Sequence, residues 1–177
     1  MPDPERPAGH AGIAILSLGF RPFFVGATLF SFVSILAWMG VYVFHWHWQP
    51  ALPGLTWHAH EMIYGYAMAV IAGFLLTAVR NWTGVQTLHG IPLLLLFLLW
   101  LAARLLLAGD SGMLAWAALA DGLFNLLLLV ALAWPVFKVR QYKQIGTLSK
   151  VMLLMFANLL FYAGALEIYP WGVQAGL

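Results

Sequence analysis

The segment from Thr56 to Val79 reads TWHAHEMIYGYAMAVIAGFLLTAV, and it decides the fold of this chain. Between Met62 and Val79 it contains no charged side chain. A helix needs roughly 20 apolar residues to cross the hydrocarbon core of a bilayer. Backbone groups in lipid must also find their hydrogen bonds inside the segment, so the stretch is predicted to cross a membrane as an α-helix.

The composition of the whole chain agrees with this prediction. Of its 177 residues, 63% are apolar and only 8% are charged, whereas a soluble domain carries about 25% charged residues. So few charges exclude a large soluble domain and predict an integral membrane protein in a lipid bilayer. The absence of cysteine excludes disulfides, thiolate metal sites and covalently attached c-type haem.

Five apolar segments are long enough, or nearly so, to cross a membrane. They are Phe23–Phe44, Trp57–Val79, Ile91–Ala108, Met113–Phe137 and Val151–Tyr169. Turn-forming or polar sequences separate them, so the prediction is an all-α bundle forming a single membrane domain over residues 1–177. Residues 1–18 are predicted to form a polar or amphipathic N-terminal segment without the basic start of a cleavable signal peptide. We find no inverted repeat and no broken mid-span helix that would favour a transporter.

The basic residues predict the orientation of the bundle. If the segments alternate in direction, one side of the membrane receives Arg6, Arg21, Arg80, Lys138, Arg140, Lys143 and Lys150. The opposite loops, HWHWQPALPGL and GDSG, contain neither Lys nor Arg. The positive-inside rule then places the N-terminus in the cytoplasm and the C-terminus outside. The net charge of +2 is small, and no nucleic-acid partner is predicted.

The motif WHAHEM is predicted to begin the second span at the outer face. His58 and Glu61 are three residues apart and share one helix face, whereas His60 points elsewhere. Thr56 is a candidate N-cap for this helix. Because ionisable residues inside membrane spans are usually functional, we favour a metal or haem site with His58 and His60 as ligands. Glu61 would ligate the metal or orient an imidazole.

The alternative interpretation of WHAHEM is a set of polar residues at the membrane boundary, with Glu61 neutralising the helix end. The same choice applies to HWHW, which ends the first span with His45 and His47. These residues either belong to an interfacial belt or supply the opposite axial ligand to a haem. Ligation needs neutral imidazole, so cofactor affinity is expected to fall as the pH falls.

Arg104, in the third span, needs a partner inside the membrane. Asp121 in the fourth span is within reach across the GDSG turn, and Asp110 in the turn is a rival. We prefer a structural ion pair with Asp121. The alternative is a functional role for Arg104 in cofactor binding, as a clamp for haem propionates, or in a proton path. Small residues repeat at Gly65, Ala69 and Gly73, which favours close helix packing.

Three sequence motifs taken together resemble those of a known family. GFRPFF (Gly19–Phe24), WHAHEM and AGFLLTAVRNWTG (Ala72–Gly84) are similar to the opening of the NnrS family. These bacterial inner-membrane proteins contain haem and copper and are linked to nitric oxide metabolism and nitrosative stress. The resemblance implies haem b, copper, the bacterial inner membrane, and His58 and His60 as cofactor residues. It covers about the first 160 residues.

The resemblance has two limits. Family members are typically about twice as long, so the chain resembles their N-terminal half. Arg80 also stands where the family pattern has proline. Two functions follow as hypotheses: a membrane haem and copper protein acting in nitric oxide or related redox metabolism, or an accessory subunit of a larger membrane complex. In the second case the histidines lie at an interface with other subunits or with a second copy of the chain.

Overall fold

The structure is a computed structural model that describes residues 14–168 and 171–177, and in these residues it contains only helices and connecting segments. The helices of the bundle are α1 (Phe20–Tyr42), α2 (Gly54–His60), the π-helix η2 (Glu61–Ala67), α3 (Met68–Thr83), α4 (Gly90–Leu107), α5 (Leu114–Lys138), α6 (Ile145–Ala165) and α7 (Gly172–Gly176). Three short 3-10 helices are η1 (Ala14–Leu16), η3 (Ser111–Met113) and η4 (Tyr142–Gln144).

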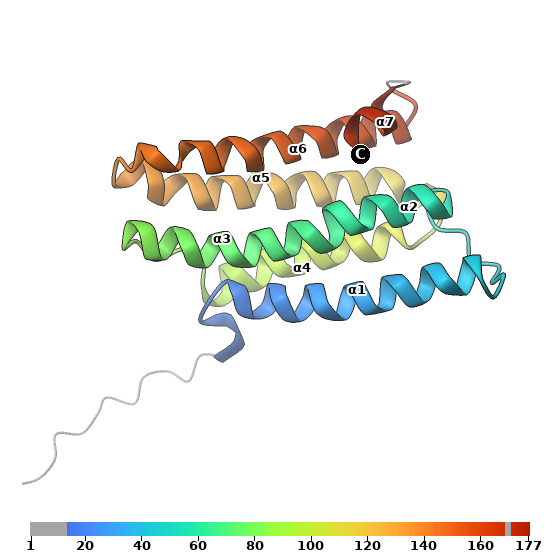
Figure 1. Cartoon of the computed structure of the whole chain (residues 1–177), viewed down its shortest axis with the longest axis horizontal. Coiled ribbons are helices and arrows are strands. Elements are labelled where there is room, and N and C mark those ends of the chain that lie inside the picture. Colours follow the sequence, from blue (N-terminus) through green and yellow to red (C-terminus); the bar gives the residue numbers. More distant parts are fainter. Residues whose placement is uncertain (1–13, 169–170) are drawn as a thin grey trace, which may run out of the picture.

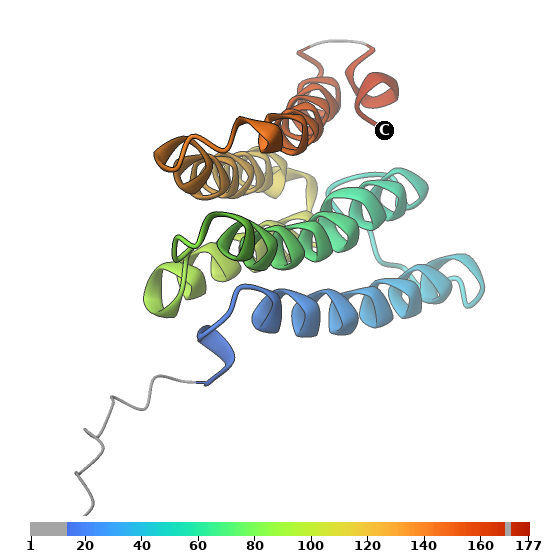
Figure 2. The ribbon, with the colours of Figure 1, turned by 60° about the vertical axis from the view of Figure 1, so that its left-hand side comes forward.

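Five of the helical segments are long and apolar enough to cross a membrane, which confirms the all-α prediction. Both ribbon views place α1 and α6 on opposite sides of the bundle, with α3, α4 and α5 between them (Figures 1 and 2). The second segment is one continuous helical rod in which α2, η2 and α3 follow one another without a break. The rod runs from Gly54 to Thr83, slightly beyond the predicted bounds at both ends.

The rod begins earlier than the sequence predicted. Thr56 was expected to be the N-cap, but Pro53 occupies that position with φ −53° and ψ 139°. Proline has no N–H to leave unpaired, and its fixed φ suits the entry to a helix. Thr56 therefore lies inside α2, and His58 and His60 fall in its last turn rather than its first.

The last long helix is displaced from its predicted position. Helix α6 begins at Ile145 instead of Val151, because the polar residues of its first two turns lie at the bundle end, where exposed side chains such as Lys150 are tolerated. The helix ends at Ala165, and the chain turns at Glu167, which is exposed and has φ 60°. Tyr169, the predicted end of this span, lies outside the described residues.

Glycine allows the two N-terminal spans to pack closely. A Cβ on Gly73 would lie 3.0 Å from the Cβ of Phe23 and 3.2 Å from the Cα of Phe20. Helix α3 thus approaches α1 through its small-residue face, which confirms the packing role predicted for Gly73. Around this contact Phe23 forms a core with Leu76, Trp100 and other apolar residues of the neighbouring helices.

The two ends of the bundle differ in charge. The end at the left of Figure 1 is basic. It holds the last turns of α3 and α5, the short helix η4 and the start of α6, which carry Arg80, Lys138, Lys143 and Lys150 in that order. At the right, the segments 43–53, 108–113 and 166–168 contain neither Lys nor Arg. We call this second end the α2 end. Large apolar side chains on the outer faces of the helices are exposed, as expected for a surface in contact with lipid.

Candidate functional site at the α2 end

The two histidines of WHAHEM point in different directions. Side chains two positions apart on an α-helix are separated by roughly 200° around its axis. The ring of His58 faces α1 and stacks on Trp38, with 4.8 Å between the ring centroids and an interplanar angle of 22°. His60 is fully buried and faces α6, where the rings of Phe161 and Tyr162 flank it. The structure does not bring the two imidazoles together.

Both ring nitrogens of His60 already face oxygen atoms. Nδ1 lies 3.1 Å from Oε1 of Glu61, and Nε2 lies 3.0 Å from Oδ1 of Asn158. A metal ion would have to displace one of these partners to reach the ring. The structure therefore gives His60 a buried polar contact between α2 and α6, and its role as a ligand stays a prediction.

Arg104 of α4 bridges Glu61 and a second carboxylate. Its Nη1 lies 3.1 Å from Oε1 of Glu61, and its Nη2 lies 2.7 Å from Oδ2 of Asp121 in α5. All three side chains are almost completely buried. The predicted ion pair between Arg104 and Asp121 is confirmed. Asp110 is not the partner, because its Oδ1 accepts a hydrogen bond from the backbone N–H of Gly112.

Two further side chains of α6 complete this arrangement. Asn158 donates from Nδ2 to Oδ2 of Asp121 at 3.0 Å, and the hydroxyl of Tyr162 donates to the same oxygen at 3.3 Å. We call the whole set the buried polar cluster; its members are His60, Glu61, Arg104, Asp121, Asn158 and Tyr162. The two α6 members were not predicted from the sequence. An asparagine in an otherwise apolar span is the signal that indicates such a role for Asn158.

The cluster adjoins a π-helix that the sequence did not predict. The segment Glu61–Ala67 follows α2 directly, and π-helical turns are rare and frequent at functional sites. Trp100 of α4 donates a hydrogen bond from its indole N–H to the carbonyl of Gly65 at 3.0 Å. A Cβ on Gly65 would lie 2.8 Å from Oε2 of Glu61, so only glycine leaves room for the carboxylate.

The histidines of HWHW lie at the same end but on the surface. His45 and His47 follow α1, both are exposed, and His45 has φ 55°. In residues 14–168 and 171–177 no three His, Cys, Asp or Glu side chains are grouped closely enough to hold a metal ion. The predicted ligands are thus all near the α2 end, but they do not form one preassembled metal centre there.

The fold and the cluster define the class of this protein: a polytopic α-helical membrane protein with ion pairs buried between its spans. The model of the NnrS protein family matches residues 14–177. The chain therefore belongs to the NnrS family, and the match extends beyond the first 160 residues that the motifs indicated. No curated protein and no solved structure matches the chain significantly.

Proposed function

We propose that this protein binds haem b at the α2 end through His58 and acts in nitric oxide or related redox metabolism in the bacterial inner membrane. One observation favours His58 over His60 as the haem ligand. The Nδ1 atom of His58 is buried and has no hydrogen-bond partner within the described part of the chain. A neutral imidazole nitrogen is the commonest metal ligand in proteins.

The surroundings of His58 suit a ligand. Trp38 stacks on its ring and is itself stacked on Tyr42 at 5.3 Å, so the plane of the imidazole is fixed. His45 and His47 are exposed at the same end and are the candidates for a second ligand. When bound, haem iron supplies a coordination position for a diatomic molecule such as nitric oxide. Copper is the alternative metal, because imidazole serves both.

The buried polar cluster would support this site without ligating the cofactor. Arg104 is paired with Glu61 and Asp121, so its charge is already neutralised and a clamp on haem propionates is disfavoured. His60 holds α2 against α6 through Asn158. Since His58 lies two residues away on the opposite face, this contact fixes the direction in which His58 points.

The experiment is a pyridine haemochrome assay with metal analysis on the purified full chain. His58→Ala should lose most of the bound haem and its Soret band, whereas His89→Ala, near the opposite end of the bundle, should retain both. His45→Ala and His47→Ala test the second ligand separately. An unchanged Soret spectrum in His58→Ala would contradict the proposal. If the purified chain contains copper but no haem, and His58→Ala loses that copper, the metal bound at His58 is copper.

The accessory-subunit hypothesis has one specific observation in its favour. His45 and His47 are two positions apart and exposed at the α2 end, where another chain would have access to them. The mass of the detergent-solubilised protein, isolated under native conditions, distinguishes the two functions. A stable complex with other chains and no haem or copper in this chain would select the subunit.

A further inference from the structure

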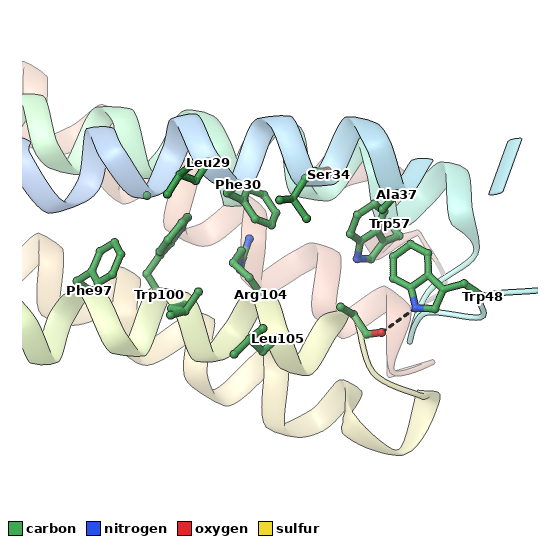
Figure 3. A pocket seen from close by; sticks show the side chains of 14 residues that line it. Leu29, Phe30, Ser34, Ala37, Trp48, Trp57, Phe97, Trp100, Arg104 and Leu105 are labelled. Atoms are coloured by element: carbon green, nitrogen blue, oxygen red, sulfur yellow. Dashed lines mark hydrogen bonds between the residues drawn. The ribbon is translucent and has the colours of Figure 1, made fainter. Parts of the chain in front are cut away.

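A cavity of about 440 Å³ lies between α1 and α4, close to the α2 end (Figure 3). This volume is within the usual range for sites that bind small molecules. Aromatic side chains form much of its wall, among them Phe30 and Trp100 in the middle of the membrane spans. Leu29 and Leu105 also line it, and they are 63% and 66% exposed on the lipid-facing surface. The cavity is therefore open to molecules dissolved in the membrane.

One hydroxyl on the cavity wall has an unusual environment. Thr28 and Ser31 of α1 each donate a hydrogen bond to a carbonyl of the preceding turn, as hydroxyls in membrane helices usually do. Ser34, one turn further on, is 1% exposed, and its Oγ has no partner among residues 14–168 and 171–177. Ser34 and Arg104 both line the cavity, from α1 and α4 respectively (Figure 3). A buried donor without an acceptor is costly, most of all inside a membrane.

One indole on the same wall repeats this pattern. Three tryptophans line the cavity. Trp48 donates its N–H to the carbonyl of Ala108, and Trp100 donates to that of Gly65. Trp57 is 3% exposed, and its Nε1 is buried with no acceptor in the part of the chain that the structure describes. Apart from Arg104 the wall is apolar and aromatic, and Ser34 and Trp57 each contribute to it a hydrogen-bond donor without an acceptor.

The charges near the cavity decide which kind of acceptor fits. Arg104 lines it, but its guanidinium is paired with the carboxylates of Glu61 and Asp121. One cation against two buried carboxylates leaves no excess of positive charge to attract an anion. The donors of Ser34 and Trp57 therefore favour an acceptor that is uncharged.

We propose that this cavity is a binding site for a lipid-soluble quinone. A flat quinone ring packs against aromatic walls, and its carbonyl oxygens accept hydrogen bonds from the Ser34 hydroxyl and the Trp57 indole. An isoprenoid tail passes between Leu29 and Leu105 into the lipid. An acyl chain alone would fill the apolar space but would leave both donors without an acceptor. The proposal concerns binding only and is independent of haem binding at His58.

The test uses the full chain in phosphatidylcholine nanodiscs and an azido derivative of ubiquinone with one isoprene unit. Photolysis should crosslink the probe to α1, α2 or α4, and unlabelled ubiquinone with the same tail should compete. Ser34→Ala and Trp57→Phe should each weaken binding about fivefold to tenfold, the effect of losing one neutral hydrogen bond. Ala37→Phe, which fills the cavity and removes no polar group, should abolish the crosslink.

Matched variants control for changes that do not involve the cavity. Ser31→Ala removes a hydroxyl from the same helix, and Trp116→Phe replaces an exposed indole; both should bind the probe like the unmodified chain. Competition by farnesol or phospholipid as strong as that by the quinone would overturn the proposal and indicate an acyl-chain site. Binding within twofold of the unmodified chain in both Ser34→Ala and Trp57→Phe would also overturn it.

Discussion

Replacing Arg104 by glutamine gives the sharpest test of the buried polar cluster. The change keeps a long polar side chain but removes the guanidinium that contacts both Glu61 and Asp121. The two carboxylates then remain buried without a counter-charge. Removing one partner of a buried ion pair destabilises a protein by about 3–5 kcal/mol. For a domain of this size each kcal/mol lowers the Tm by about 2–4 °C, so the Tm should fall by about 6–20 °C.

The assay is thermal unfolding of the purified chain in mild detergent, followed by size-exclusion chromatography of the heated samples. Asp110→Asn is the matched control, because the Asp110 carboxylate accepts an exposed hydrogen bond from a backbone N–H and its replacement should change the Tm little. The double variant with Arg104→Gln and Asp121→Asn should be more stable than Arg104→Gln alone, since it removes one uncompensated charge. If Arg104→Gln unfolds within about 2 °C of the unmodified chain, the ion pairs do not stabilise the bundle as the distances indicate.

Three other predictions follow from the same distances and exposures. Gly65→Ala should lower the Tm clearly, because its Cβ would collide with Glu61, whereas Gly146→Ala, with open space around it, should not. Trp100→Phe should cost about 1 kcal/mol in unfolding free energy, through loss of its hydrogen bond to Gly65. The chain has no cysteine, so single cysteines report orientation: Ser111→Cys should react with an impermeant maleimide in intact spheroplasts, and Lys143→Cys only after lysis.

The sequence predicted the five spans because lipid imposes a simple rule on composition. Apolar runs of sufficient length must become helices, and the observed ends lie close to the predicted ones in the first four spans. The prediction was less accurate where polar residues continue a helix past its apolar run, as at the start of α6. The pairing of Arg104 with Asp121 was also predictable, since a short turn brings α4 and α5 together and neither charge is stable alone.

The direction of His60 was only partly predictable. Its spacing from His58 indicated a different face, but no local pattern specified Asn158, which is far along the chain in α6, as its partner. Three-dimensional packing decides that contact. The π-helix after His60 was not predictable either, because after Glu61 its residues form an ordinary apolar run. The hydrogen bond from Trp100 to the carbonyl of Gly65 within it comes from another helix and has no local signal.

These contacts place the polar side chains of the WHAHEM motif on two different faces of the helix. His60 and Glu61 lie inward, and through the buried polar cluster they connect α2 and η2 to α4, α5 and α6. Because both are held there, the helix cannot rotate about its axis without breaking buried polar contacts, at a cost in lipid that exceeds the cost in water. His58 is consequently held on the opposite face, against Trp38. The inner residues would then matter to a cofactor through the orientation of His58, so His60→Ala should weaken cofactor binding less than His58→Ala and should lower the Tm more.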